Sequence, residues 1–157
     1  MTSVLASSRR AILSVAAGAA LGGCAPASLL NALVPDGAYD LAEGMAYGDG
    51  PRRKLDVYRP KGEGPHPVVV FFYGGSWRNG DRADYRFVGE ALAASGAVAI
   101  LPDYRVHPEA RYPDFVEDGA AAVAWAVGHA AAYGGDPQRV VAIVRRQRLW
   151  DRIGVVS

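Results

Sequence analysis

The feature that most restricts the fold is the run Val68–Tyr73, which contains only apolar residues that favour β-structure. A strand without polar alternation has both faces covered, which is typical of the interior of a parallel sheet. Two more runs of this kind follow, at residues 97–101 and 140–144. Residues 54–58 alternate between polar and apolar and predict a half-buried strand. The chain therefore predicts a sheet with several interior strands.

Two helices are expected between these strands. Apolar residues recur at helical spacing in 87–94, and Gly96 occupies the position of a left-handed helix stop. A second helix is predicted to begin near Pro113, with acidic residues in its first turns, and to end at residues 134–135. Alternation of buried strands with helices predicts an α/β fold, with a mostly parallel sheet flanked by helices.

The first 23 residues have the layout of an export signal. Arg9 and Arg10 precede an apolar stretch, residues 11–23, that is too short to span a bilayer. Residues 8–13 resemble a twin-arginine signal, and residues 21–24 resemble the lipobox of bacterial lipoproteins. That resemblance implies lipidation of Cys24 and a membrane-anchored lipoprotein. Two alternatives stay open: a cleaved signal with a periplasmic product, and an uncleaved helix with a buried cysteine.

The expected organisation has four parts. A signal peptide, residues 1–23, is followed by a tether, residues 24–46, by the folded part, residues 47–144, and by a basic tail, residues 145–157. The net charge of +1 gives no general attraction to nucleic acid, so no nucleic-acid partner is expected. A single cysteine excludes an intrachain disulfide and a multi-cysteine metal site, and no metal site is expected.

The strand Val68–Tyr73 runs directly into the loop Gly74–Trp77. The carboxyl end of a strand in such a sheet is where ligands usually bind. Adjacent glycines permit a sharp turn whose backbone amides can point at one spot and stabilise a developing oxyanion. Loss of one such donor costs about 3–4 kcal/mol in acyl-transfer enzymes. Taken alone, the loop is also compatible with a tight turn after a buried strand.

Four ordered motifs extend the argument: residues 73–77, 103–105, 112–118 and 133–137. Together they resemble the esterase and lipase branch of the α/β-hydrolases, in particular feruloyl-esterase-like and carboxylesterase members with an oxyanion loop of the His-Gly-Gly-Ser-Trp type. The resemblance covers about residues 44–144. It implies a small acyl-ester substrate, serine acyl transfer and no cofactor. It also assigns oxyanion donors to the amides of Gly75 and Ser76, with Gly74 making the turn, while Tyr73 replaces the usual histidine.

No catalytic residue is assigned, because no triad can be recognised. In this family the strand at residues 140–144 leads into a Gly-x-Ser-x-Gly elbow, whereas here it leads into Arg-Arg-Gln-Arg-Leu. Ser76 lacks the final glycine of that motif and follows the wrong strand. We therefore expect the chain to be inactive alone, with residues 140–144 as an exposed apolar edge. A lipid-anchored, non-catalytic binding protein and a frameshifted, non-functional product are the alternatives.

The remaining polar candidates receive supporting roles. His107 either faces the same pocket or is solvated, and Asp103 is expected to orient neighbouring loop backbone or Arg105. Asp136 is expected to cap or turn the chain before the last strand. His66 and His129 are placed in a turn and near a helix end.

Overall fold

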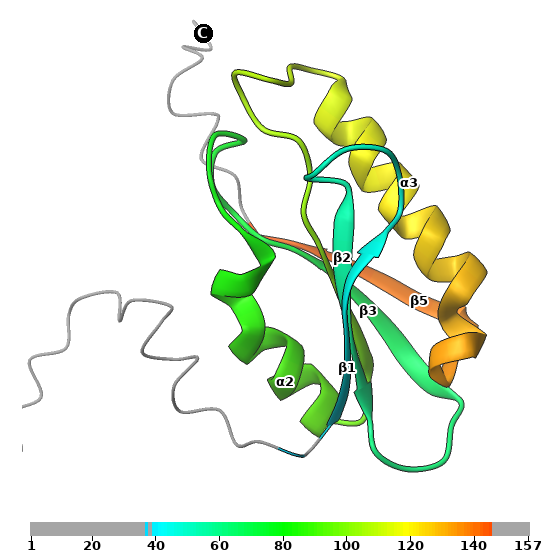
Figure 1. The fold of residues 1–157 in the computed structure, drawn as a ribbon. Helices are drawn as coiled ribbons and strands as arrows, with labels where there is room; N and C mark the ends of the chain where they lie inside the picture. The colour runs from blue at the N-terminus through cyan, green and yellow to red at the C-terminus, as the bar shows by residue number, and fades with distance from the viewer. Residues whose placement is uncertain (1–36, 38, 146–157) are drawn as a thin grey trace, which may run out of the picture.

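The structure, a computed structural model, describes residue 37 and residues 39–145. These residues form one mixed sheet with helical elements packed against it (Figure 1). In chain order the elements are β1 (Tyr39–Ala46), β2 (Lys54–Pro60), β3 (His66–Phe72), η1 (Arg82–Tyr85), α2 (Arg86–Ala94), β4 (Val98–Pro102), α3 (Asp114–His129), η2 (Ala130–Tyr133) and β5 (Gly135–Val144). The signal peptide and the lipidation site predicted at Cys24 lie outside the described residues, as does the basic tail after Arg145.

The strand order in the sheet is β1-β2-β4-β3-β5. β3 runs parallel to both of its neighbours, so that Val69 lies opposite Ala99 of β4 and Val141 of β5. β2 is antiparallel to β4 and to β1. The sheet is therefore mixed: its β4-β3-β5 part is parallel, as predicted, and its two N-terminal strands join as an antiparallel hairpin.

Two sequence predictions about the N-terminal strands were wrong. The last eight residues of the expected tether form β1, whose pairing with β2 is interrupted by a bulge between Ala42 and Met45. The bulge breaks the two-residue period, which is why the sequence shows no sustained alternation there. β2 is not half-buried, because the polar residue Asp56 is itself buried and accepts hydrogen bonds from Gly44 N and Arg82 Nε.

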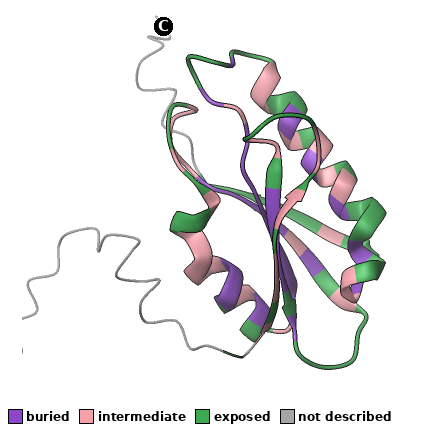
Figure 2. Cartoon of the chain, viewed as in Figure 1, coloured by how far each residue is buried: buried purple, intermediate pink, exposed green. Residues whose placement is uncertain are grey.

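The helices α2 and α3 lie on opposite faces of the sheet (Figure 1). α2 packs over β2 and β4, and Gly96 follows it with a φ of 88°, as predicted. α3 packs over β3, β4 and β5 and has Pro113 as its N-cap residue. Buried residues gather on the strands and on the helix faces turned toward them (Figure 2). Among the described residues, no helix combines the length and hydropathy needed to span a membrane.

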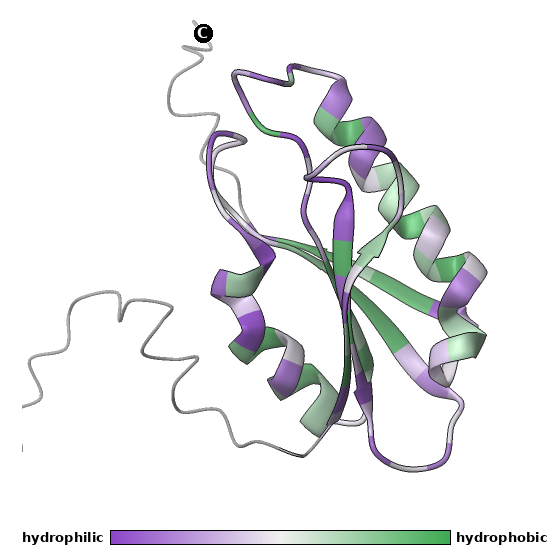
Figure 3. Ribbon diagram, viewed as in Figure 1, coloured by the Kyte–Doolittle hydropathy of each residue, from purple (hydrophilic) through white to green (hydrophobic). Residues whose placement is uncertain are grey.

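The apolar residues of the sheet continue to its outer strand, β5 (Figure 3). Among the described residues β5 pairs only with β3, so its other edge is open. Val141, Ile143 and Val144 are 56%, 42% and 59% exposed, which confirms the exposed apolar edge predicted for residues 140–144.

Candidate oxyanion site

The loop that follows β3 folds back on itself in a tight turn. Ser76 and Trp77 both have left-handed backbone conformations, with φ of 55° and 59°. The amides of Arg78 and Asn79 donate to the carbonyl oxygen of Gly75, at 3.0 and 3.4 Å. A side chain on Gly75 would overlap the carbonyl oxygen of Asn79, so only glycine fits this turn.

The far end of the loop is attached to the segment that follows β4. The amide of His107 donates to the carbonyl oxygen of Trp77 at 2.7 Å. The Trp77 ring stacks on Phe115 in the first turn of α3, with centroids 4.3 Å apart, and meets Tyr104 edge-on. These contacts fix the loop from two elements that are distant in sequence.

Tyr73, which stands where the resemblance predicts histidine, is fully buried. Its hydroxyl donates to Asp103 Oδ1 at 2.7 Å and accepts from Arg52 Nη2 at 3.1 Å. Its ring stacks with Tyr104 and Tyr85, and the hydroxyl of Tyr104 donates to the Tyr73 carbonyl oxygen at 2.8 Å. Burial, and then the charge of Asp103, raise the pKa of Tyr73 well above its ordinary value. The side chain is therefore a neutral donor within a packed aromatic stack.

The carboxylate of Asp103 holds the chain after the loop in place, through the backbone amide and the guanidinium group of Arg82. It accepts from the Arg82 amide at 2.9 Å and forms an ion pair with the Arg82 guanidinium, which also bonds Asp56 at 2.8 Å. Burial lowers the pKa of Arg82, but its hydrogen bonds to Asp56 and Asp103 outweigh that effect and raise the pKa. Of the two partners expected for Asp103, loop backbone or Arg105, its carboxylate bonds backbone, at Arg82 where η1 begins, and Arg105 is not among its hydrogen-bond partners in the described residues.

Arg105 instead binds Asp118, a fully buried residue of α3. The Arg105 backbone amide and its Nε donate to Asp118 Oδ2 at 2.9 and 2.8 Å, and Nη2 donates to Oδ1 at 2.8 Å. Arg53 Nε lies 3.1 Å from the same carboxylate. The hydrogen bond to Asp118 is the main cause of the raised pKa of Arg105. From the sequence, Asp118 was placed only among the acidic residues in the first turns of the helix. The indication of this contact was that residues 103–105 and 112–118 are motifs of the same family pattern.

A hollow of about 530 Å³ opens where the loop meets the carboxyl end of β5. Its lining consists of Gly74, Gly75, Ser76, Asn79, Gly80, Asp84, Tyr85 and Arg145. The three predicted oxyanion residues are thus brought together at one hollow. Arg145, directly after β5, donates from its amide to the Phe72 carbonyl oxygen at 2.9 Å and from Nη1 to the Tyr85 hydroxyl at 3.3 Å. The elbow motif expected by resemblance at this position is absent from the sequence.

None of the three histidines lines this hollow. His107 is exposed and lines a separate recess, while His66 begins β3 rather than lying in a turn, with Nδ1 3.1 Å from the Gly96 carbonyl oxygen. His129 ends α3, as predicted.

Asp136 lies near the start of β5 and accepts a hydrogen bond from the Gln138 amide at 2.9 Å, which is the local turn contact predicted for it. Across residues 39–145 no cluster of three metal-ligating side chains occurs.

Comparison with known proteins decides the family. The family model BD-FAE matches residues 55–144, which is more than half of the chain. The chain belongs to the BD-FAE family. This BD-FAE chain is 37% identical over 97 residues to isoprenylcysteine alpha-carbonyl methylesterase ICME of Arabidopsis thaliana, and 43% identical over 95 residues to esterase LipC of Mycobacterium tuberculosis. Those matches cover 61% and 59% of this chain.

The fold comparison agrees with the sequence comparison. The BD-FAE chain superposes on the esterase of Pyrobaculum calidifontis with a TM-score of 0.66 and 27% identity, over 75% of this chain. The predicted partial α/β-hydrolase fold and the esterase resemblance are confirmed. The chain spans 23% of ICME, 24% of LipC and 39% of the Pyrobaculum esterase.

Proposed function

We propose that this BD-FAE chain serves carboxylic ester hydrolysis as the part of the site that binds the oxyanion. When a serine oxygen attacks an acyl carbon, the carbonyl electron pair moves onto the carbonyl oxygen, which becomes negative. The amides of Gly75 and Ser76 donate to that oxygen, and Gly74 permits the turn. The observation that carries this proposal is the turn itself: left-handed Ser76 and side-chain-free Gly75 at the carboxyl end of an interior strand.

The same proposal limits what the chain does alone. Ser76 belongs to the oxyanion turn and not to an elbow after β5, so it is assigned as a backbone donor. No residue of this sequence is assigned as nucleophile, acid or histidine of a triad. We infer that the chain does not turn over small acyl esters by itself, and that it uses no cofactor.

An anion titration followed by amide NMR tests the oxyanion assignment. Butylphosphonate, a short-chain anion that mimics the charged oxygen of the intermediate, is expected to shift the amide resonances of Gly75 and Ser76 in a saturable manner. The variant Gly75→Ala, in which the new methyl group overlaps Asn79, is expected to lose this response. Gly119→Ala is the matched control, because its methyl group meets only ordinary contacts with Phe72 at 3.8 Å. A response that survives Gly75→Ala unchanged would contradict the proposal.

An ester assay tests the inferred inactivity. With p-nitrophenyl butyrate, the purified chain and its Gly75→Ala variant are expected to release nitrophenol at the same rate as buffer. Turnover by the purified chain that disappears in Ser76→Ala would identify Ser76 as a nucleophile and overturn the assignment.

We also propose that the protein is exported and anchored to the membrane through a lipid on Cys24. The support is the order of paired arginines, a short apolar stretch and a cysteine after two glycines. In cells fed an alkyne-tagged fatty acid, the full chain is expected to become labelled and to sediment with membranes. Cys24→Ala should be unlabelled, whereas labelling that persists in this variant would contradict the anchor.

A further inference from the structure

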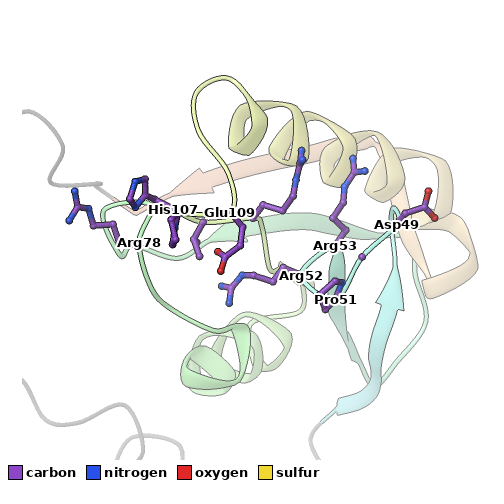
Figure 4. A pocket seen from close by; sticks show the side chains of 11 residues that line it. Asp49, Pro51, Arg52, Arg53, Arg78, His107 and Glu109 are labelled. Atoms are coloured by element: carbon purple, nitrogen blue, oxygen red, sulfur yellow. The ribbon is translucent and has the colours of Figure 1, made fainter.

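A second recess, of about 470 Å³, lies beside the oxyanion turn, and Figure 4 shows the side chains that line it. It is built by the connection between β1 and β2, by the segment after β4, and by Arg78 of the turn. Its lining includes Arg52, Arg53, Arg78, Arg105, His107 and Glu109. We call it the arginine recess. Its volume is within the range of sites for small ligands.

The walls of the arginine recess are held in place by hydrogen bonds between distant segments. Arg52 Nε donates to the Tyr104 carbonyl oxygen at 2.9 Å, and the Asp103 amide donates to the Lys54 carbonyl oxygen at 2.9 Å. The bond from His107 to Trp77 attaches the recess to the oxyanion turn. The recess is therefore a formed feature of the fold and lies next to the proposed site.

Positive charge exceeds negative charge around the recess. Arg53 and Arg105 share one carboxylate, that of Asp118. Among the described residues, Arg52 donates only to neutral oxygens, those of Tyr73, Gly80 and Tyr104. Four arginines thus line the recess, against three carboxylates when the buried Asp118 is counted with the exposed lining residues Asp49 and Glu109.

The residue types favour a carboxylate as the ligand. A guanidinium group offers paired N–H donors that match the two oxygens of a carboxylate, and such charge-assisted bonds are stronger than neutral ones. Arg78 lies at the outer end of the recess beside His107, with its guanidinium turned away from Arg52 and Arg53 (Figure 4). Within the described part of the chain the Arg78 side chain makes no ion pair, so rotation toward a ligand breaks no ion pair.

We propose that the arginine recess binds the carboxylate of an acidic ester, and that it thereby selects monoesters of dicarboxylic acids. This inference rests on the proposed function, because it places the ester carbonyl at Gly75 and Ser76. Arg78 directly follows the oxyanion turn, and its own amide donates to the Gly75 carbonyl oxygen at 3.0 Å. The arginine recess therefore begins directly after the residues proposed to bind the ester carbonyl.

The test compares two esters of similar size, monoethyl succinate, which carries a carboxylate, and ethyl butyrate, which does not. Titration of the full chain at low salt, followed by amide NMR, is expected to show saturable shifts at Arg78 and His107 with monoethyl succinate only. Arg78→Gln is expected to weaken binding by roughly three- to tenfold, the size expected for one charge-assisted contact. Glu109→Gln removes a competing carboxylate and is expected to strengthen binding by about two- to fivefold.

Arg139→Gln is the matched control, because Arg139 is an exposed arginine of β5 that pairs with Asp136 outside the recess. It should leave the Kd for monoethyl succinate unchanged. Equal binding of ethyl butyrate, or a Kd unaffected by both Arg78→Gln and Glu109→Gln, would overturn the inference. Acetate bound as tightly as monoethyl succinate would overturn the substrate assignment, since the recess would then bind any anion.

The oxyanion assignment and the substrate inference can each be overturned without the other. If butylphosphonate shifts Gly75 and Ser76 while monoethyl succinate leaves the recess unchanged, the oxyanion assignment stands and the substrate inference is overturned. If the recess binds monoethyl succinate while the turn ignores butylphosphonate, the carboxylate site is supported and the oxyanion assignment is overturned.

Discussion

At the scale of single residues, Tyr73 joins the oxyanion turn to the hairpin formed by β1 and β2. Its hydroxyl lies between a carboxylate, Asp103, and a guanidinium, Arg52, which belongs to the connection between those strands. A phenol reaches both groups and fills the space between Tyr85 and Tyr104 with its ring. The residue that departs from the family pattern is therefore bonded into the buried polar network of this chain.

Replacing Tyr73 by phenylalanine should cost stability in a pH-dependent way. At pH 7 we expect Tyr73→Phe to lower the free energy of unfolding by about 1–3 kcal/mol, because buried polar partners lose a hydrogen bond. The folded-state pKa of Tyr73 is raised, so its stabilisation is complete below the unfolded pKa of about 10 and is lost as the pH rises beyond it. Urea denaturation between pH 7 and 11 should show the two proteins converging at high pH.

The control for this measurement is Tyr112→Phe. Tyr112 is 79% exposed, and its loss of a hydroxyl should leave the free energy of unfolding unchanged at pH 7. A difference between wild type and Tyr73→Phe that stays constant from pH 7 to 11 would contradict the raised pKa.

At the scale of elements, the packing of α2 on β2 depends on a glycine. An added Cβ at Gly89 would lie 2.5 Å from the ring of Tyr58, which is buried under the helix. In α3, by contrast, an added Cβ at Gly128 would have no heavy atom within 4 Å. Replacing glycine by alanine at these two positions therefore distinguishes the effect of packing on stability from the effect of helix propensity.

We expect Gly89→Ala to lower the free energy of unfolding by roughly 1–3 kcal/mol, the usual cost of overfilling a packed interface. Gly128→Ala should raise it by about 0.5–1 kcal/mol, because alanine favours the helix and meets open space. Thermal and urea denaturation of both variants would check the pair. Equal effects of the two substitutions would show that α2 does not approach β2 as closely as described.

The elements also show how far the sequence could predict the structure. The apolar runs at 68–73, 97–101 and 140–144 were sufficient for the three parallel strands, and Gly96 and Pro113 were sufficient for two helix ends. β1 escaped prediction because its bulge removes the alternation. The partners of Asp103 and Arg105 escaped it because a charge in a sequence does not say which opposite charge it will meet. The position of the loop Gly74–Trp77 directly after an interior strand was predicted from the apolar run and the paired glycines, whereas its role in binding an oxyanion stays a prediction.

At the scale of the whole molecule, the apolar surface is distributed unevenly. Beside β5 and α3 lies an apolar hollow of about 570 Å³ lined by Phe72, Trp77, Phe115, Val116, Gly119, Ala120, Val123, Ala124 and Val144. This hollow is continuous with an outer strand whose far edge is open among the described residues. Exposed apolar strands of this kind pair with other chains.

We therefore expect the purified protein to self-associate as its concentration rises. The double variant Val141→Lys/Ile143→Lys places charges on the exposed side of β5 and should stay monomeric in sedimentation velocity. Gln138→Lys, which adds a charge to the exposed start of the same strand, should associate like the wild type. A wild type that remains monomeric at all concentrations would show that this surface does not drive association.

The position of β3 between β4 and β5 has a consequence for local unfolding. The oxyanion turn is attached to the segment after β4 through Asp103, Tyr104 and His107, and to α3 through the stacking of Trp77 on Phe115. Transient detachment of β5 would expose the amide hydrogens of that strand to exchange with solvent, while the turn kept its tethers. The geometry proposed to bind the oxyanion thus belongs to the more protected part of the molecule, and fraying at the open edge leaves it in place.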